Sequence, residues 1–532
     1  MSENASPVGE RVRAAEVIAA LSLATDLATG LPLEHGLEST LAAMRLSERL
    51  GVDAETERQT YYACLLFYVG CTADAEVAAD LFDESALVTH LGPAMFGSQR
   101  ESALATLRAL APLEGPAPAR ALGAAGKLPR AVGAYRRHVA ALCEVAEMLT
   151  DRLGLPPTIW GLFAGFTERW DGKAPLGLAR GEEIPLAVRI VHVARDATMH
   201  RMIGGLDVAA QVVRRRGGHA FDPAVAGCLA DDVEEIFAGL AEGSAWDRVL
   251  AAEPAPALEL EGAAIDRALA AMGDFADLAS PYLVGHSAGV ARVAGAAAER
   301  CRAHGVDPTA VRRAALVHDL GRVAIPLRIW HKPGSLAADE WERVRLHAYH
   351  SERVLARSPF LAALASVASA HHERLDGSGY HRGAAAGALP LPARLLAAAD
   401  AYCAMTEPRP HREPLSADAA AETLGGEASA GRLDVSAVAA VLEAAGQPVP
   451  PMERPAGLTE REAQVVGLLA RGLQTKQVAR ALGISAKTTD RHIQNAYAKI
   501  GVSTRAAAAL FAMEHGLAAW GELPIGRSPG RA

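Results

Sequence analysis

The histidines of this chain are concentrated in one region and stand there in unusual pairs. Ten of the 18 histidines lie between residues 286 and 411. His318-Asp319 ends the apolar run AALVHD, and His371-His372 ends the apolar run LAALASVASAHH, so polar groups occupy positions where a helix would bury apolar side chains. Burying these groups is costly unless something binds them. Imidazole with carboxylate and without thiolate is a ligand set for iron, manganese or zinc, so the pairs indicate a metal site.

Helices are expected to position these groups. The 532 residues are 50% hydrophobic but only 5% aromatic, and alanine supplies much of the apolar share, which favours helices over sheets. The length predicts about three or four domains. Clusters of proline and glycine divide the chain into the following expected parts: a flexible N-terminus (1–12), a first helical domain (13–250), a second (260–445), a proline-rich linker (446–457), a C-terminal module (458–520) and a tail (521–532).

The first two domains have parallel sequences. His35 and Phe67 are 32 positions apart (67 − 35), as are His286 and His318 (318 − 286), and TERWDGKAPLG parallels HERLDGSGYHRG further on. At the polar positions of the second copy the first copy has other side chains: Phe67 for His318, Tyr68 for Asp319, Phe166 for His371, Thr167 for His372 and Arg195 for Asp400. The first copy is therefore expected to keep the scaffold and to bind no metal.

Residues 264–445 resemble the HD superfamily of metal-dependent phosphohydrolases, in its HD-GYP branch. The supporting motifs are a lone histidine, the run HDLG, a further histidine, the run HHExxDGxGY and an aspartate in the pair AD. The resemblance implies seven metal ligands: His286, His318, Asp319, His347, His371, His372 and Asp400. The resemblance implies that one metal is bound by His286, His318, Asp319 and Asp400. The second metal is then bound by His347, His371 and His372, and Asp319 bridges the two.

The implied chemistry is hydrolysis of a phosphoester. Two cations about 3.5–4 Å apart activate a water and stabilise both the entering and the leaving oxygen of an in-line displacement. Asp319 would therefore be essential for catalysis, and the nucleophile would be a water rather than a side chain. Arg322 stands where the family usually has lysine, and a guanidinium can clamp a phosphate with two hydrogen bonds. The implied cofactors are two divalent transition metal ions, iron or manganese first, with zinc, magnesium or nickel as alternatives.

Three positions depart from the family pattern. Tyr282 stands where some members have a glutamate for a third metal, which favours two metals. His381 replaces the proline of GYP, and Cys403 replaces the second aspartate of the ADxxDA run. The ligands are thus all present, whereas the signature associated with cyclic di-GMP hydrolysis is altered.

The C-terminal module is basic and has the pattern of a helix, a glycine turn and a helix. Residues 458–517 contain eight basic and four acidic side chains, a balance of +4 (8 − 4), whereas the whole chain carries −9. Thr459 with Glu462 predicts a capping box, and Thr475 and Ser485 are expected to cap the next two helices. A local basic patch on such a helix pair is typical of DNA binding.

The same module resembles the LuxR (GerE-type) helix-turn-helix family through LTERE, LLARGL, VARALGIS and TxxxHxxNxxxK. The resemblance implies a four-helix domain. Its DNA-contacting residues would be Lys487, Thr488, Arg491 and Asn495 in the major groove and Lys476 on a phosphate. The alternative is a helical protein-interaction module with a solvated basic face.

The predicted fold is all-α, with two tandem HD-type helical domains, the first without metal ligands, and a four-helix DNA-binding domain. The predicted function is a metal-dependent phosphohydrolase, a nucleotide or cyclic-dinucleotide phosphodiesterase, coupled to transcription regulation. One alternative is a regulator whose HD domain binds metal and a phosphorylated ligand without turnover, and another is oxygen chemistry at a di-iron site.

The expected partners are DNA, a phosphorylated small molecule such as cyclic di-GMP, and a second copy of the chain. No stretch reaches about 18 uninterrupted apolar residues, and no signal peptide precedes the first domain. The six cysteines are scattered, without a CxxC pair. We therefore expect a cytoplasmic protein that does not contact membranes.

Overall fold

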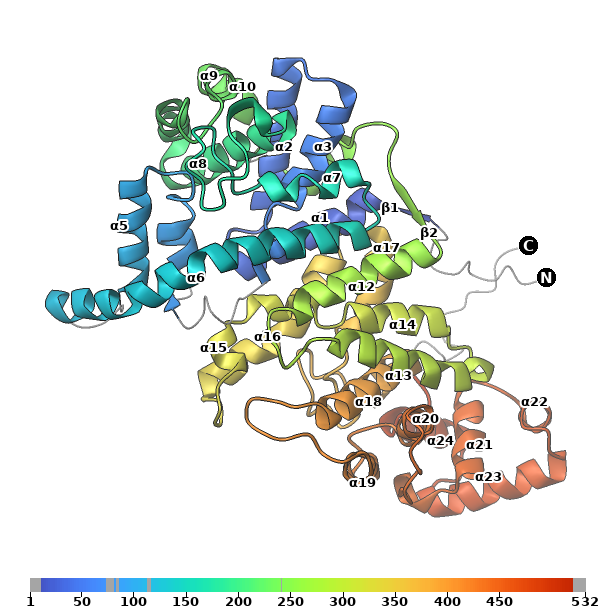
Figure 1. Ribbon diagram of the computed structural model, residues 1–532. Coiled ribbons are helices and arrows are strands. Elements are labelled where there is room, and N and C mark those ends of the chain that lie inside the picture. Colours follow the sequence, from blue (N-terminus) through green and yellow to red (C-terminus); the bar gives the residue numbers. More distant parts are fainter. Residues whose placement is uncertain (1–10, 73–80, 83–85, 112–115, 241, 520–532) are drawn as a thin grey trace. The chain divides into compact units, whose positions relative to one another are not determined.

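The protein is described by a computed structural model that covers residues 11–72, 81–82, 86–111, 116–240 and 242–519. These residues are mostly helical (Figure 1). Their one sheet pairs β1 (Arg11–Arg13) antiparallel with β2 (Glu259–Glu261). The predicted all-α fold class is therefore confirmed. By its internal contacts the chain divides into two compact units, Met1–Val284 with Leu320–Ala363, and Gly285–Asp319 with Leu364–Ala532.

The first unit holds the N-terminal half and the chain from the end of the HDLG run to α17. Its helices are α1 (Ala14–Thr29), α2 (His35–Leu50), α3 (Ala54–Leu65), α5 (Gln99–Leu110), α6 (Ala117–Arg152), α7 (Pro157–Trp160), α8 (Leu186–Arg216), α9 (Pro223–Asp231), α10 (Val233–Phe237), α11 (Ala245–Ala251), α12 (Ala263–Asp277), α15 (Leu327–Trp330) and α16 (Ala338–Leu355). The short 3-10 helix η6 (Leu320–Ala324) precedes α15.

Helix α1 forms the centre of the first unit. Every residue from Val17 to Asp26 is buried, so this helix is enclosed on all sides, as its apolar composition requires. It contacts α2, α3, η6 and α16, and α2 in turn packs against α8. Helix α8 is interrupted at Gly205, whose φ of 83° is readily adopted only by glycine.

The second unit contains α13 (His286–Arg300), α14 (Pro308–Leu316), α18 (Leu391–Thr406), α19 (Ala417–Ser429), α20 (Val435–Ala444), α21 (Glu460–Ala470), α22 (Thr475–Ala481), α23 (Ala486–Ile500) and α24 (Arg505–Glu514). The boundary between the units falls within α17 (Pro359–Ala368). Helix α13 packs against α14, α18 and α20, while α21 packs against α23 and α24.

The helix starts of the C-terminal module test the capping predictions. Thr459 and Glu462 form the predicted capping box, and the hydroxyl of Ser485 accepts a hydrogen bond from the backbone N–H of Thr488. The prediction for Thr475 was wrong by one residue. Gln474 has the extended backbone of an N-cap and its N–H donates to the Gln477 side chain, 2.8 Å away, so Thr475 is already helical.

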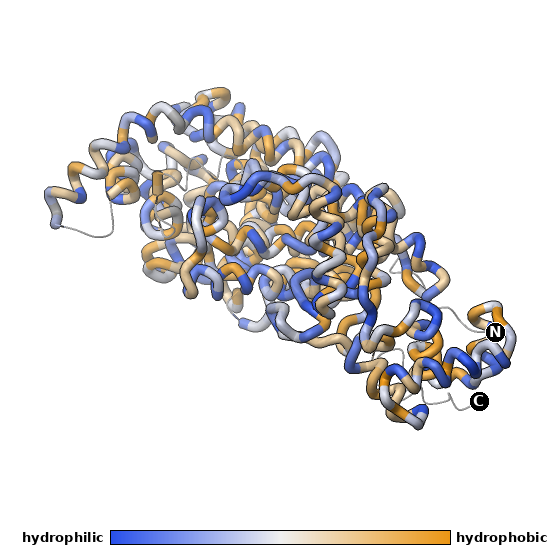
Figure 2. Tube along the Cα trace, turned by 90° about the horizontal axis from the view of Figure 1, so that it is seen from below, coloured by the Kyte–Doolittle hydropathy of each residue, from blue (hydrophilic) through white to orange (hydrophobic). Residues whose placement is uncertain are grey.

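Figure 2 shows hydrophobic and hydrophilic residues alternating in short stretches along the helices. Among the residues that the structure describes, no helix is both long enough and apolar enough to cross a membrane.

Candidate metal centre

Six of the predicted ligands lie in the second unit, and five of them are at or just after helix ends. His286 is the first residue of α13, and the HDLG pair comes two residues after α14 ends. The HH pair follows α17, and Asp400 lies within α18. The side chains that meet there are His286, His318, Asp319, His371, His372 and Asp400. All are buried except His372, which is partly exposed.

Asp319 faces histidines with both of its carboxylate oxygens. Oδ2 lies 3.8 Å from Nε2 of His286 and 3.6 Å from Nε2 of His318. Oδ1 lies 3.4 Å from Nε2 of His371. A carboxylate with its two oxygens turned to different imidazoles has the arrangement that a ligand shared by two metals requires.

Asp400 is surrounded in a similar way. Its Oδ1 lies 3.3 Å from Nε2 of His286 and 3.8 Å from Nε2 of His318, and its Oδ2 lies 3.8 Å from Nδ1 of His372. Two ligand atoms that are each about 2.0–2.2 Å from one ion lie about 3–3.6 Å apart in tetrahedral or octahedral coordination. The 3.3 Å between Asp400 Oδ1 and His286 Nε2 lies within this range, and the two separations of 3.8 Å are slightly longer.

Hydrogen bonds to the main chain orient two of the imidazoles. Nδ1 of His318 is 2.7 Å from the carbonyl oxygen of Ala315, and Nδ1 of His371 is 2.7 Å from that of Ala368. A carbonyl oxygen only accepts, so Nδ1 carries the proton and Nε2 directs its lone pair to the carboxylates. Neutral imidazole nitrogens beside carboxylates are a donor set that fits divalent transition metals.

The pKa values in the centre reflect burial and close opposite charge. Burial lowers the pKa of His318 to about 4, which keeps it in the neutral form that binds metals. Burial opposes the charged form of His286, but hydrogen bonds to Asp400 and Glu407 raise its pKa to about 9. Burial would raise the pKa of Asp400, yet its hydrogen bond with His286 and the imidazole of His372 hold it well below the usual value.

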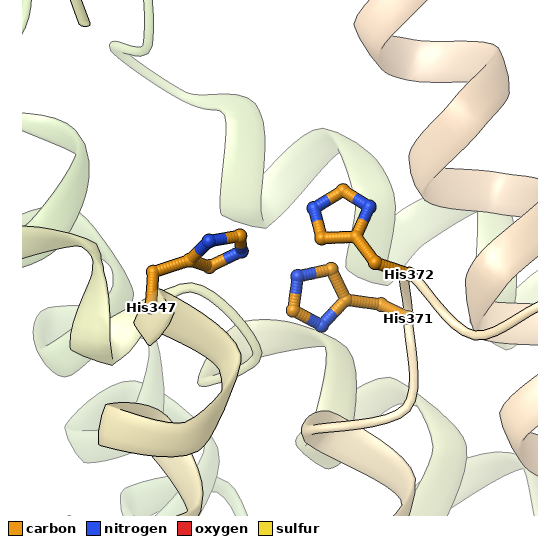
Figure 3. A group of neighbouring side chains, drawn as sticks. All are labelled: His347, His371 and His372. Atoms are coloured by element: carbon orange, nitrogen blue, oxygen red, sulfur yellow. The ribbon is translucent and has the colours of Figure 1, made fainter. Parts of the chain in front are cut away.

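His347 and Arg322, the other predicted site residues, belong to the first unit. His347 is buried on α16, and its Nδ1 is 2.5 Å from the carbonyl oxygen of Val344; Figure 3 labels it with His371 and His372. The guanidinium of Arg322, in η6, lies 4.0 Å from the centre of the Trp330 ring, and that ring is 5.7 Å from the ring of His347. Trp330 is thus a common neighbour of both predicted residues.

Sequence analysis did not identify Glu407, which directly follows α18. Its Oε2 lies 2.8 Å from Nδ1 of His286, and Arg409 donates to the same oxygen at 3.0 Å. The residue belongs to none of the motifs that indicated the site, so the sequence offers no signal that would have singled it out.

Comparisons with known proteins match two parts of the chain to families. Residues 271–437 match the HD domain, and residues 456–512 match the luxR family of bacterial regulatory proteins. The chain contains an HD domain joined to a LuxR-type DNA-binding domain.

Relatives with this HD domain are phosphodiesterases. The chain is 28% identical over 409 residues to 3'3'-cGAMP-specific phosphodiesterase 3 of Vibrio cholerae, which covers 76% of this chain and 89% of that protein. It is 39% identical over 131 residues to a cyclic di-GMP phosphodiesterase of Thermotoga maritima, covering 24% of this chain and 36% of that enzyme. These similarities identify the HD domain as that of a hydrolase.

A solved structure shares the fold of most of the chain. It is the crystal structure of a cyclic GMP-AMP specific phosphodiesterase of V. cholerae, with a TM-score of 0.56 and 24% identity, and the match covers 82% of this chain and 98% of that one. The 409-residue sequence alignment is longer than the 262 residues from 271 to the C-terminus (532 − 271 + 1), so it also includes part of the N-terminal half.

In the N-terminal half, the residues aligned with the ligands of the HD domain also contact one another. The rings of Phe67 and Phe166 stack with their centres 5.3 Å apart, and the guanidinium of Arg195 lies 4.3 Å from the ring centre of Tyr68. His35 begins α2, just as its counterpart begins α13, and the residue before each has a positive φ. The positions that the predicted repeat pairs with the proposed ligands are therefore neighbours in space, and they carry aromatic rings and a buried guanidinium.

The predicted DNA-contacting residues of the LuxR-type domain lie on α22 and α23. The residues predicted for the major groove are all on α23, at positions 487, 488, 491 and 495. Lys476 on α22 is exposed, as are all the α23 positions except Thr488, which is half-buried. Ile493 and Ala496 on the other side of α23 are buried against the rest of the domain. The basic side chains therefore remain accessible.

Proposed function

We propose that the HD domain is a two-metal phosphodiesterase of the HD-GYP type that hydrolyses a cyclic dinucleotide, and that the LuxR-type domain lets the same chain regulate transcription. The observation that supports this most directly is the carboxylate of Asp319, whose two oxygens face different histidines. A ligand shared by two metals requires this arrangement, and Asp319 lies between the imidazoles that we assign to different ions.

The ligands divide between two ions. His286, His318, Asp319 and Asp400 would hold the first, and His347, His371 and His372 would hold the second together with Asp319. When bound, the two ions would activate water and neutralise charge that develops on the phosphoryl oxygens. The imidazole and carboxylate donors favour iron or manganese, with zinc, magnesium or nickel as alternatives.

The proposed substrate is a cyclic dinucleotide because the relatives of the HD domain are named for 3'3'-cGAMP and cyclic di-GMP. Arg322 would clamp a non-bridging phosphate oxygen pair, a task for which its planar guanidinium is suited. The contact with Trp330 fixes the plane of that guanidinium.

A substrate screen tests the proposal. Metal-replete protein would be incubated with 3'3'-cGAMP, cyclic di-GMP and linear dinucleotides, and products separated by chromatography. We expect a linear product from at least one cyclic dinucleotide. Ligand binding without any product would instead favour a regulator that senses a phosphorylated ligand, and oxygen consumption would favour di-iron oxygen chemistry.

Regulation of DNA binding is part of the proposal. Arg394 lies on α18, six positions before Asp400, and donates hydrogen bonds to the carbonyl oxygens of Gly516, just after α24, and of Ala386, at 2.8 Å. The helix that would supply Asp400 to the metal is therefore hydrogen-bonded to the chain at the end of the LuxR-type domain. A change of α18 on metal or substrate binding would reach the DNA-binding helices by this route.

Homodimerisation is also proposed, because one recognition helix reads too few base pairs to select an operator alone. Action on an operator implies that the protein works in the cytoplasm, where the chromosome is accessible.

A further inference from the structure

Glu407 contacts a proposed metal ligand from behind. It is the residue directly after α18, and its Oε2 lies 2.8 Å from Nδ1 of His286. Nε2, across the same ring, is the nitrogen that faces Asp400 at 3.3 Å and Asp319 at 3.8 Å. The carboxylate of Glu407 is therefore on the opposite side of the imidazole from the other proposed ligands and is not itself placed as one of them.

The contact determines which nitrogen of His286 can bind a cation. A carboxylate oxygen only accepts, so Nδ1 of His286 must carry a proton in this hydrogen bond. When a cation replaces the proton on Nε2, that nitrogen supplies the lone pair for coordination, and the ring cannot rotate without losing its bond to Glu407. His318 and His371 obtain the same orientation from main-chain carbonyl oxygens, whereas His286 obtains it from a charged side chain.

Glu407 is itself held in place. Nη2 of Arg409 donates to Oε2 at 3.0 Å, and the Glu407 side chain is 27% exposed while that of His286 is 1% exposed. Asp400 and Cys403 are three residues apart on α18, and Glu407, with an extended backbone, is the C-cap residue that ends this helix.

We propose that Glu407 is a positioning residue for the metal bound by His286: it fixes the tautomer and orientation of the imidazole and increases its basicity toward the ion. The inference rests on the proposed function only in requiring that the centre binds metal. Partners of this kind typically change metal affinity by about 10–100-fold when they are removed.

Metal titration of the full-length protein tests the inference. Metal-stripped protein would be titrated with Mn²⁺ against a chelating indicator, comparing wild type with Glu407→Gln, which keeps the size of the side chain and removes its charge. We expect two sites in the wild type and an affinity reduced about 10–100-fold for one of them in the variant. His286→Ala should weaken the same site more strongly, and Glu407→Asp should recover part of the affinity lost in Glu407→Gln.

Glu443→Gln is the matched control. Glu443 lies on α20 and pairs with Arg300, 3.4 Å away, so its variant should bind Mn²⁺ as the wild type does. Both sites at wild-type affinity in folded Glu407→Gln, or equal weakening by Glu443→Gln, would overturn the inference. Circular dichroism of the metal-free protein shows whether Glu407→Gln folds. If it does not fold, the Mn²⁺ affinities of Glu407→Asp and the control are compared instead, and equal affinities would overturn the inference. Intact metal sites without any hydrolysis would overturn the proposed function and leave this inference standing.

Discussion

The carboxylate of Asp319 places Oδ1 3.4 Å from Nε2 of His371, while its second oxygen is turned toward the other imidazoles of the centre. One short side chain, from the second residue of the HDLG run, thus lies between two groups of nitrogen donors. The proposed two-metal centre depends on that side chain more than on any other residue.

Asp319→Ala is expected to release both metals and to reduce hydrolysis to background. Two cations about 3.5–4 Å apart repel each other strongly, and the variant lacks the shared negative charge that offsets this repulsion. Metal content by mass spectrometry would fall from about two ions per chain toward none. Asp418→Ala, on the exposed side of α19, is the control and should behave as wild type. Near-normal activity of Asp319→Ala with two bound ions would contradict the ligand assignment.

The N-terminal half is expected to bind no transition metal. Phe67, Phe166 and Arg195 supply rings and a cation where the HD domain has imidazoles and a carboxylate. In the full-length chain, the combined variant His318→Ala, Asp319→Ala, His371→Ala, His372→Ala, which lacks ligands of both proposed metals, should therefore purify with no residual metal after dialysis. One ion per chain that survives these substitutions would show that the first copy has a site of its own.

The stability of the N-terminal half is expected to depend on pH through Asp26. This carboxyl group is buried, and burial raises its pKa from 3.8 to about 7, although Arg195 and the N–H of Gly36 oppose the shift. The folded state therefore takes up a proton between about pH 4 and pH 7, and its stability falls as pH rises through this window. Thermal melts at pH 5 and pH 8 should show a smaller decrease for Asp26→Asn than for wild type. Glu55→Gln, an exposed control, should lose as much stability between pH 5 and pH 8 as the wild type does. If Asp26→Asn also lost as much as the wild type, Asp26 would not titrate in this pH window.

The LuxR-type domain is expected to divide its DNA contacts between base reading and phosphate binding. Arg491→Ala should cost about 1–3 kcal/mol on the preferred operator and relax its base preference, because the side chain is placed to reach base edges. Lys476→Ala should weaken binding to every DNA sequence by a similar factor and reduce the salt dependence of binding. Binding curves on operator and scrambled DNA at several salt concentrations distinguish the two. Arg302→Ala, on the exposed surface of the HD domain, is the control. Identical effects of the first two variants on all sequences would refute the division.

Metal binding is expected to alter DNA affinity through the contact between Arg394 and Gly516. Operator titrations of metal-loaded and metal-stripped protein at fixed salt should differ, typically by about 5–150-fold for coupled sites, and DNA should change metal affinity by the same factor. Arg394→Ala should reduce the difference. Coincident curves for loaded and stripped wild type would mean that the two activities share a chain without being coupled.

The fold class could be predicted, and so could most of the side chains that gather in the candidate metal centre, because both depend on patterns within the sequence. Low aromatic content and alanine-rich runs predict helices, and the pairs HD and HH interrupt apolar runs where only a ligand would justify imidazoles. The repeat also identified neighbours in space, since Phe67 and Phe166, which are distant in sequence, stack together.

Glu407 and Arg394 could not be predicted for a common reason. Each makes its decisive contact with a residue more than one hundred positions away, and neither lies in a motif. The capping error at Thr475 has a local cause instead. Threonine is the better N-cap by type, but the backbone becomes helical one residue earlier than expected because Gln474 and Gln477 satisfy the helix start.

The most direct test of the central claim is one chromatographic assay of 3'3'-cGAMP and cyclic di-GMP with metal-replete wild type and Asp319→Ala side by side. We predict that the wild type linearises at least one of the two cyclic dinucleotides and that a chelator abolishes this product. Asp319→Ala should form no linear product. Intact substrate with two metals bound to the wild type, or equal product from Asp319→Ala, would contradict it.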